Sequence, residues 1–383
     1  MIEMHTASTV EIDEIDDAVK EILDQLPLGA LKKNSVGILY CCMDFVETGV
    51  VGALDKALPF SVLGMTTMAS ADRNNLGMYN LTLTVLTSDD VLFETVVTGP
   101  LFSTDYKEKI AATYKRARAG LPGDPACILS FIPYTPDISG TELTVSLDAT
   151  SGGIPVWGGV TVSLDVYNGP CCTILEGRAQ ERVLGMILVY GSVNPEFIVA
   201  SIPEENIFYE KRAIITSSEN CILRTVNDMP VLQFFESIGM TIRPESSATL
   251  PFMVDYKDGS TPVVLGISSV LEDGSVLCGG PVPQGALIAM CELTREGILA
   301  TTRQSVEKIL QLDKNALLMM PCVIRYVMMA PQNDEEMRLV ADTLAGKMPY
   351  VMAYCGGEIC PVRDGNGRWR NRFHHYTFTA CVL

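Results

Sequence analysis

Two charged side chains near the carboxyl end of the chain have the chemistry needed to hold a small zwitterion. Arg325 follows an apolar run, where an unpaired guanidinium would be costly to bury, so it either pairs with an acid or receives an anion. Glu358 stands beside two glycines, so it can project into the same crevice and accept a ligand ammonium group. In the competing interpretation, Arg325 and Glu358 pair with each other.

Three further side chains could line such a crevice. His374 and His375 are two of the three histidines in the chain, and neighbours on a strand point to opposite faces, so only one of them can face the crevice. A histidine beside an apolar strand also commonly has a structural role. Thr377 adds a hydroxyl group, and Cys322 lies in an apolar run, where we expect a buried lining thiol rather than a reactive one.

The elements that must position these side chains recur three times along the sequence. Each copy has an apolar strand, a helical stretch, a proline with apolar residues, and a turn of small residues. The strand and turn pairs are 38–40 with 59–64, 128–130 with 155–159, and 323–325 with 349–358. A crossover between parallel strands leaves its turn at the carboxyl edge of a sheet, where open sheets usually bind ligands. Glycine exposes backbone N–H groups there, so we expect ligand contacts at Gly158, Gly159, Gly356 and Gly357.

This pattern predicts a mixed α/β fold, in which duplicated strand-helix-strand-strand units form mixed sheets flanked by helices. The spacing of apolar residues predicts helices at 12–26, 105–119, 302–312 and 334–345. It predicts strands at 79–86, 92–97 and 376–383, and a hairpin over 213–226. A short helix from Pro230 ends at Gly239, and we place a domain boundary there. The expected domains are residues 1–236, with two internal repeats, and residues 237–383.

Composition excludes several classes of partner. The formal net charge is -18, which disfavours binding to nucleic acid or to an anionic membrane surface. No apolar stretch reaches the roughly 20 residues that span a bilayer, and no basic start precedes an apolar run, so we expect a cytoplasmic protein without membrane insertion. The 12 cysteines lie mostly in apolar contexts, which is typical of reduced core thiols. We expect no cofactor and no structural metal.

The order of these segments resembles the FIST domain family over nearly the whole chain. The carboxyl-terminal part of the resemblance rests on Leu318-Met319-Met320-Pro321-Cys322-Val323-Ile324-Arg325, on Pro349 through Tyr354-Cys355-Gly356-Gly357-Glu358-Ile359-Cys360-Pro361, and on Phe373-His374-His375-Tyr376-Thr377. The amino-terminal part rests on Ile154-Pro155-Val156-Trp157-Gly158-Gly159 and on Val226-Asn227-Asp228-Met229-Pro230-Val231-Leu232.

The resemblance implies an intracellular sensory module that binds a small ligand, with amino acids as one suggested class. Its position in the motif favours His374 over His375 as the crevice residue. The chain departs from the family pattern in its first copy, where Gly64-Met65-Thr66-Thr67-Met68-Ala69-Ser70 replaces Gly-Cys-Ser-Ser-x-Gly-Glu. It departs again at His375, where family members more often have asparagine.

Three functions remain open on the sequence. In the first, which we favour, the protein is a binding module that signals through a separate protein. In the second, Cys322, His374 and Glu358 form a thiol hydrolase site. In the third, cysteine and histidine side chains bind a metal or haem, as is associated with some FIST proteins. The candidate ligands for that third function are Cys355, Cys360, His374 and His375, but the spacing of the two cysteines is a weak metal pattern.

Overall fold

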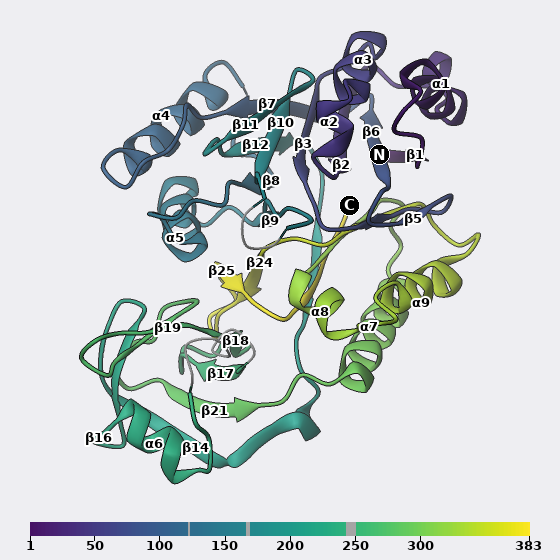
Figure 1. Ribbon diagram of the computed structural model, residues 1–383. Coiled ribbons are helices and arrows are strands. Elements are labelled where there is room, and N and C mark those ends of the chain that lie inside the picture. Colours follow the sequence, from purple (N-terminus) through teal and green to yellow (C-terminus); the bar gives the residue numbers. More distant parts are fainter. Residues whose placement is uncertain (122, 166–168, 243–249) are drawn as a thin grey trace.

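The computed structural model describes residues 1–121, 123–165, 169–242 and 250–383, and in this part the strands form four sheets with helices around them (Figure 1). This is the mixed α/β class that the sequence predicts. Three of the sheets make up one body. The fourth sheet forms a separate element over residues 204–291, which we call the lobe and which lies below the body in Figure 1.

The body contains three successive units that have a similar series of strands and helices. The first unit has β1 (Glu3–Thr9), α1 (Ile15–Gln25), β2 (Asn34–Cys41), α2 (Asp44–Glu47), α3 (Val50–Ala57), β3 (Val62–Thr66), β4 (Ser70–Ala71), β5 (Leu76–Gly77) and β6 (Leu81–Ser88). The second has β7 (Leu92–Val97), α4 (Tyr106–Arg118), β8 (Cys127–Ile132), α5 (Gly140–Ser151), β9 (Val156–Val160), β10 (Cys172–Leu175), β11 (Arg178–Glu181) and β12 (Gly185–Tyr190). The third has β13 (Glu196–Ala200), α7 (Arg295–Ile309), β22 (Leu317–Pro321), α8 (Val323–Met328), α9 (Glu335–Leu344), β23 (Tyr350–Ala353), β24 (Glu358–Arg363), β25 (Trp369–His374) and β26 (Phe378–Val382).

The three sheets of the body share one strand order. They read β1-β6-β2-β3-β10-β11, β7-β12-β8-β9-β24-β25 and β13-β26-β22-β23-β4-β5. In each sheet the two central strands are parallel and are joined by a helical crossover, namely β2 with β3, β8 with β9, and β22 with β23. The three predicted crossovers are therefore present.

Each unit also completes the sheet of another unit. The hairpin β10–β11 of the second unit pairs with β3 of the first, and β24–β25 of the third unit pairs with β9 of the second. The hairpin β4–β5 of the first unit pairs with β23 of the third, which closes the cycle. The three sheets are thereby joined into a ring.

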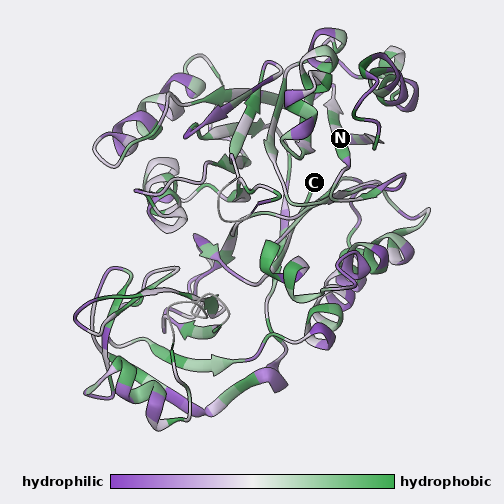
Figure 2. Ribbon diagram, in the orientation of Figure 1, coloured by the Kyte–Doolittle hydropathy of each residue, from purple (hydrophilic) through white to green (hydrophobic). Residues whose placement is uncertain are grey.

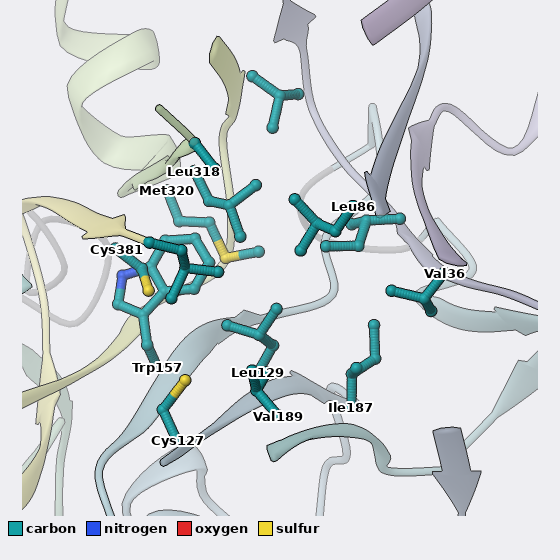
Figure 3. Packing of buried hydrophobic residues seen from close by; sticks show 14 of the residues in the cluster. Val36, Leu86, Cys127, Leu129, Trp157, Ile187, Val189, Leu318, Met320 and Cys381 are labelled. Atoms are coloured by element: carbon teal, nitrogen blue, oxygen red, sulfur yellow. The ribbon is translucent and has the colours of Figure 1, made fainter. Parts of the chain in front are cut away.

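An apolar core fills the inside of this ring. Residues on the inner faces of all three sheets form one buried cluster, which includes Val36, Leu129, Trp157, Ile187, Leu318 and Cys381 (Figure 3). Most of the helices lie on the outside of the sheets, and α1, α4, α7 and α9 carry hydrophilic segments there, whereas α8 is mainly hydrophobic (Figure 2). Burying each large apolar side chain stabilises the fold by roughly 1.5–3 kcal/mol, so the shared core holds the three units together.

The lobe is inserted into the third unit, between β13 and α7. It contains β14 (Ile207–Glu219), β15 (Ile222–Val226), β16 (Met229–Pro230), α6 (Val231–Ser237), β17 (Phe252–Asp255), β18 (Val263–Leu265), β19 (Ile267–Val270), β20 (Val276–Cys278) and β21 (Leu287–Cys291). The expected hairpin over 213–226 is present as β14 and β15. The predicted boundary after residue 236 falls inside the lobe, because β14 pairs with β21 and β15 pairs with β20.

Two local predictions are wrong. Val323–Arg325 was expected to be part of a strand, but β22 ends at Pro321, and after a single bridge at Cys322 these residues begin α8. The helix predicted at 302–312 begins earlier, at Arg295, because the Thr294 hydroxyl accepts a hydrogen bond from the Gly297 N–H and caps it. No helix in the described residues is both long and apolar enough to cross a membrane.

Candidate functional site

The chain segments that follow the three crossovers meet one another. The Val162 N–H donates to the Thr66 carbonyl at 3.1 Å, and the Gly356 N–H donates to the Val160 carbonyl at 2.8 Å. The Tyr354 N–H donates to the Ala69 carbonyl at 3.0 Å, which links the third segment to the first. Backbone hydrogen bonds therefore join all three crossovers at one place, which we call the junction.

Glycines permit this close approach, but they do not serve as free donors. Gly158 and Gly159 were expected in a turn; they lie inside β9, between β8 and β24, where the sheet ladders occupy the backbone. A Cβ atom on Gly159 would lie 2.6 Å from the Cys355 sulfur, and one on Gly158 would overlap the Ser130 carbonyl. The prediction that these two N–H groups bind a ligand is corrected accordingly.

Gly356 and Gly357 do lie in a turn, between β23 and β24. The Gly356 N–H donates to the Val160 carbonyl and the Gly357 carbonyl accepts from the Val160 N–H, so these two hydrogen bonds hold the turn against the end of β9. Gly357 has a φ of +135°, a conformation that favours glycine, and a Cβ atom there would lie 2.5 Å from the Phe373 ring. The role of the two glycines is to let the chain turn tightly into Glu358.

Glu358 is the chemically distinctive group of the junction. Its side chain is fully buried at the start of β24, and in the described residues no lysine or arginine forms an ion pair with it. It accepts a hydrogen bond from the Thr377 hydroxyl and one from the Cys355 thiol at 3.6 Å. Burial raises the pKa of Glu358 from 4.5 to about 8, although bonds from Thr377, Cys322 and Cys355 oppose the rise. The carboxyl group is therefore mostly protonated at neutral pH.

Two thiols flank this carboxyl group. Cys322 and Cys355 form a parallel β-bridge, and both side chains are buried. Burial, followed by the nearby Glu358 charge, raises the pKa of Cys322 well above its ordinary value. A thiolate is the reactive form of cysteine, so Cys322 lacks the activation that a thiol hydrolase needs.

Arg325 is held by a different acid from the one expected. Its guanidinium and the Glu336 carboxylate are both fully buried, and the Arg325 Nη2 lies 2.7 Å from the Glu336 Oε1. The remaining guanidinium hydrogens go to the Ile298 and Tyr376 carbonyls and to the hydroxyls of α7. The expectation that Arg325 holds a ligand anion is not supported, because protein groups engage all three of its nitrogens. Its alternative, a pair with Glu358, is also wrong.

Of the two adjacent histidines, His374 is buried and His375 is half-buried, and both are bonded to the backbone. His374 lies on β25 directly across from Glu358, and its Nε2 is 3.1 Å from the Cys360 carbonyl oxygen. Burial lowers the pKa of His374 to about 4, so the ring is neutral at pH 7. The hydrogen bond described for this ring joins its Nε2 to a backbone carbonyl oxygen and not to Cys322. In the described residues no cluster of three histidine, cysteine or acidic side chains could hold a metal ion.

The structure thus brings together most of the predicted residues and adds one that the sequence analysis missed. Gly159, Cys322, Gly356, Glu358 and Thr377 meet at the junction. The missed residue is Glu336, beside Arg325, whereas Cys355, which the sequence suggested only as a metal or haem ligand, lies beside Glu358. Glu336 could have been found from sequence, because it falls on the same face of its helix as the apolar Val340 and Leu344, where a carboxylate needs a partner.

Comparisons with known proteins bear on this part of the chain. Residues 234–361, about one third of the chain, match the FIST C domain. No curated protein sequence matches the chain. Among solved structures, a cyanuric acid hydrolase from A. caulinodans is similar over 50% of this chain and 72% of its own, at 11% identity and a TM-score of 0.27. PurL of T. maritima in complex with ATP covers 100% of this chain and 71% of its own, at 11% identity and a TM-score of 0.19. These TM-scores are too low to support an argument.

Proposed function

The chain carries a FIST C domain at residues 234–361, and from this premise we propose that the protein is a sensor that binds a small polar ligand at Glu358 and signals through a separate protein. FIST domains are associated with the sensing of small ligands in signal transduction. The proposed ligand carries an amino group, and amino acids are one class that fits.

The observation that carries the proposal is a buried carboxyl group that has no cationic partner among the residues that the structure describes. Buried acids are ordinarily paired, as Glu336 is paired with Arg325. Glu358 instead stays protonated through burial, among two thiols and a hydroxyl group. A ligand ammonium group placed beside it would supply the missing charge and would favour the ionised carboxylate.

This mechanism assigns a role to each residue of the site. Glu358 binds the ligand cation, while Thr377 donates to one carboxylate oxygen and fixes its direction. Cys322 and Cys355 line the site as neutral thiols. His374 and the turn at Gly356 and Gly357 form the supporting wall. Arg325 positions the segment that carries Thr377, through its bond to the Tyr376 carbonyl at 3.2 Å.

Proton release provides a direct test of the role of Glu358. At pH 7 a carboxyl group with a pKa of about 8 is roughly 90% protonated, so a bound cation should displace about 0.9 proton. Thermal-shift screening of amino acids, the matching amines and the matching deaminated acids would first identify a ligand. A ligand at about a hundred times its Kd should stabilise the fold by about 2.7 kcal/mol.

Titration calorimetry in buffers of different ionisation enthalpy then counts the protons that are released. We expect amines and amino acids to bind, deaminated acids to fail, and Glu358→Gln to abolish both binding and proton release. Glu205→Gln, in the exposed turn at the start of the lobe, is the matched control and should behave like the native protein. Binding that survives in Glu358→Gln, or a preference for the deaminated acids, would contradict the proposal.

A further inference from the structure

The segment from His375 to Thr377 contacts the lobe on one side and the Glu358 site on the other. On the lobe side, the His375 N–H donates to the Val264 carbonyl at 3.3 Å, and the His375 Nε2 lies 3.0 Å from the Gly279 carbonyl oxygen. On the site side, the Thr377 hydroxyl donates to Glu358, and the Thr377 carbonyl accepts the Cys322 N–H at 2.9 Å. Only Tyr376 separates the two sets of contacts.

Tyr376 holds this short segment in a constrained conformation. Its φ of +61° is in the left-handed region, which costs free energy for a residue with a side chain and persists only where the surroundings enforce it. The surroundings are the lobe and the helices of the third unit together, because Tyr376 packs in one buried cluster with Met253 and Val264 of the lobe and with Ile298 and Met329.

The lobe surface that meets this segment is fitted to it closely. A Cβ atom on Gly279 would lie 2.5 Å from the His375 Nε2, and one on Gly266 would overlap the Tyr376 hydroxyl oxygen. The His375 ring cannot move away easily, because it packs edge-on against Phe373 at a centroid distance of 4.9 Å. A second contact lies nearby, where the Arg372 Nη2 meets the Asp258 Oδ2 at 2.5 Å.

We infer that the lobe regulates the Glu358 site: when docked on His375 it keeps Thr377 bonded to Glu358 and the site closed, and when it moves away it releases Thr377 and opens the site. This regulation rests on the proposed function for its biological meaning. The buried location of Glu358 requires such an opening, since no ligand reaches a fully covered carboxyl group. The lobe is the element whose separation would uncover the segment, because its sheet has one buried cluster of its own and meets the body through a second, smaller cluster that contains Tyr376.

Amide hydrogen exchange, read by mass spectrometry or NMR, tests the coupling without any ligand. The first variant is Gly279→Ala, whose added methyl group should clash with the His375 ring and push the lobe away from it. The matched control is Gly280→Ala, whose added methyl group would meet Leu265 inside the lobe, at 2.6 Å, and leave the contact with the body unchanged. The second variant, Asp258→Asn, weakens the contact between lobe and body more mildly, because it removes the charge opposite Arg372 without adding bulk.

We expect Gly279→Ala to raise the exchange rates of the His375 and Cys322 amides together, by at least about tenfold, and Asp258→Asn to raise both by a smaller factor. Gly280→Ala should change exchange within the lobe and leave Cys322 as in the native protein. If His375 exchanges faster while Cys322 does not, the lobe and the site are independent and the inference is overturned. Should Gly279→Ala fail to fold, Asp258→Asn decides in the same way.

The exchange experiment and the ligand-binding experiment test separate hypotheses, and either can be refuted without the other. A joint response of His375 and Cys322 supports the coupling whether or not any amine binds. If amines bind but the exchange rate of the Cys322 amide is unchanged in both Gly279→Ala and Asp258→Asn, Glu358 remains the proposed ligand-binding residue and the lobe does not regulate it.

Discussion

The protonation state of Glu358 makes the stability of the protein depend on pH in a way that a single substitution can isolate. In the unfolded chain the carboxyl group ionises near pH 4.5, whereas in the fold burial raises its pKa to about 8. Between these values the folded protein binds the extra proton, so stability falls as pH rises, by about 1.4 kcal/mol per pH unit. Below pH 4.5 and above pH 8 this contribution no longer changes.

Glutamine has the shape of the protonated carboxyl group and does not titrate. Glu358→Gln should therefore be close to the native protein in stability at pH 4 and should become progressively more stable than it up to pH 9. The interval from 4.5 to about 8 gives a total gain of about 5 kcal/mol. This is an unusual direction, because most substitutions of a residue in a fold lower its stability.

Urea unfolding of both proteins at a series of pH values measures this difference, and the contributions of all other titrating groups cancel in it. Cys322 does not interfere, since its pKa is raised well above this range. Thr377→Val serves as a control for packing, because it removes the hydroxyl group and keeps the carboxyl group. A stability difference that stays constant from pH 4 to pH 9 would show that Glu358 does not carry a proton in the fold, and the reasoning would be wrong.

Two further predictions concern groups that hold the site. Arg325→Met should destabilise the fold by about 3–5 kcal/mol, because it leaves the buried Glu336 without its charged partner. The double variant Arg325→Met/Glu336→Leu should recover much of this loss. Equal losses in the single and double variants would contradict this prediction. Gly158→Ala should cost 3 kcal/mol or more, about the upper end for overpacking, because its Cβ would overlap the Ser130 carbonyl, whereas the exposed Gly99→Ala should change unfolding by less than about 0.5 kcal/mol. Denaturation midpoints of folded variants, or loss of soluble protein for Gly158→Ala, provide the measurement.

The sequence predicts the crossovers because their signals are local. Apolar strands, helical spacing and the prolines before β3, β9 and β23 all lie within short windows, and the structure has parallel pairs at all three places. The convergence of the turns at one junction follows from long-range pairing, which local periodicity does not contain. Glycine was therefore interpreted as a flexible donor at Gly158, where in fact a neighbouring backbone leaves no space for a side chain.

The partners of buried charges were harder to predict for the same reason. The sequence indicates that Arg325 needs an acid, and Glu358 was the nearest candidate in the motif. In the structure the partner of Arg325 is Glu336, eleven residues away on α9, because α8 directs the Arg325 side chain toward α7 and α9 and away from the junction. A strand at Arg325, as expected, would have placed the side chain differently, so one wrong secondary-structure assignment produced the wrong partner.

The lobe shows a further limit of sequence reasoning. Its strands occur on both sides of the predicted boundary, and the composition of the two halves does not differ enough to reveal that β14 will pair with β21. The family match begins at residue 234, within α6, so the match also starts inside this sheet. Family boundaries and sheet boundaries therefore differ in this chain.

The reciprocal exchange of hairpins has a consequence for how the molecule can be divided. A polypeptide cut out as a single unit, such as residues 3–88, would lose β10–β11 from the edge of β3, and its own β4–β5 would have no β23 to join. Both edges would present unpaired backbone to water or to other chains. A closed trimer of such fragments would pair these edges in the way that the three units do, so the covalent chain has the architecture of three interlocked protomers fused end to end.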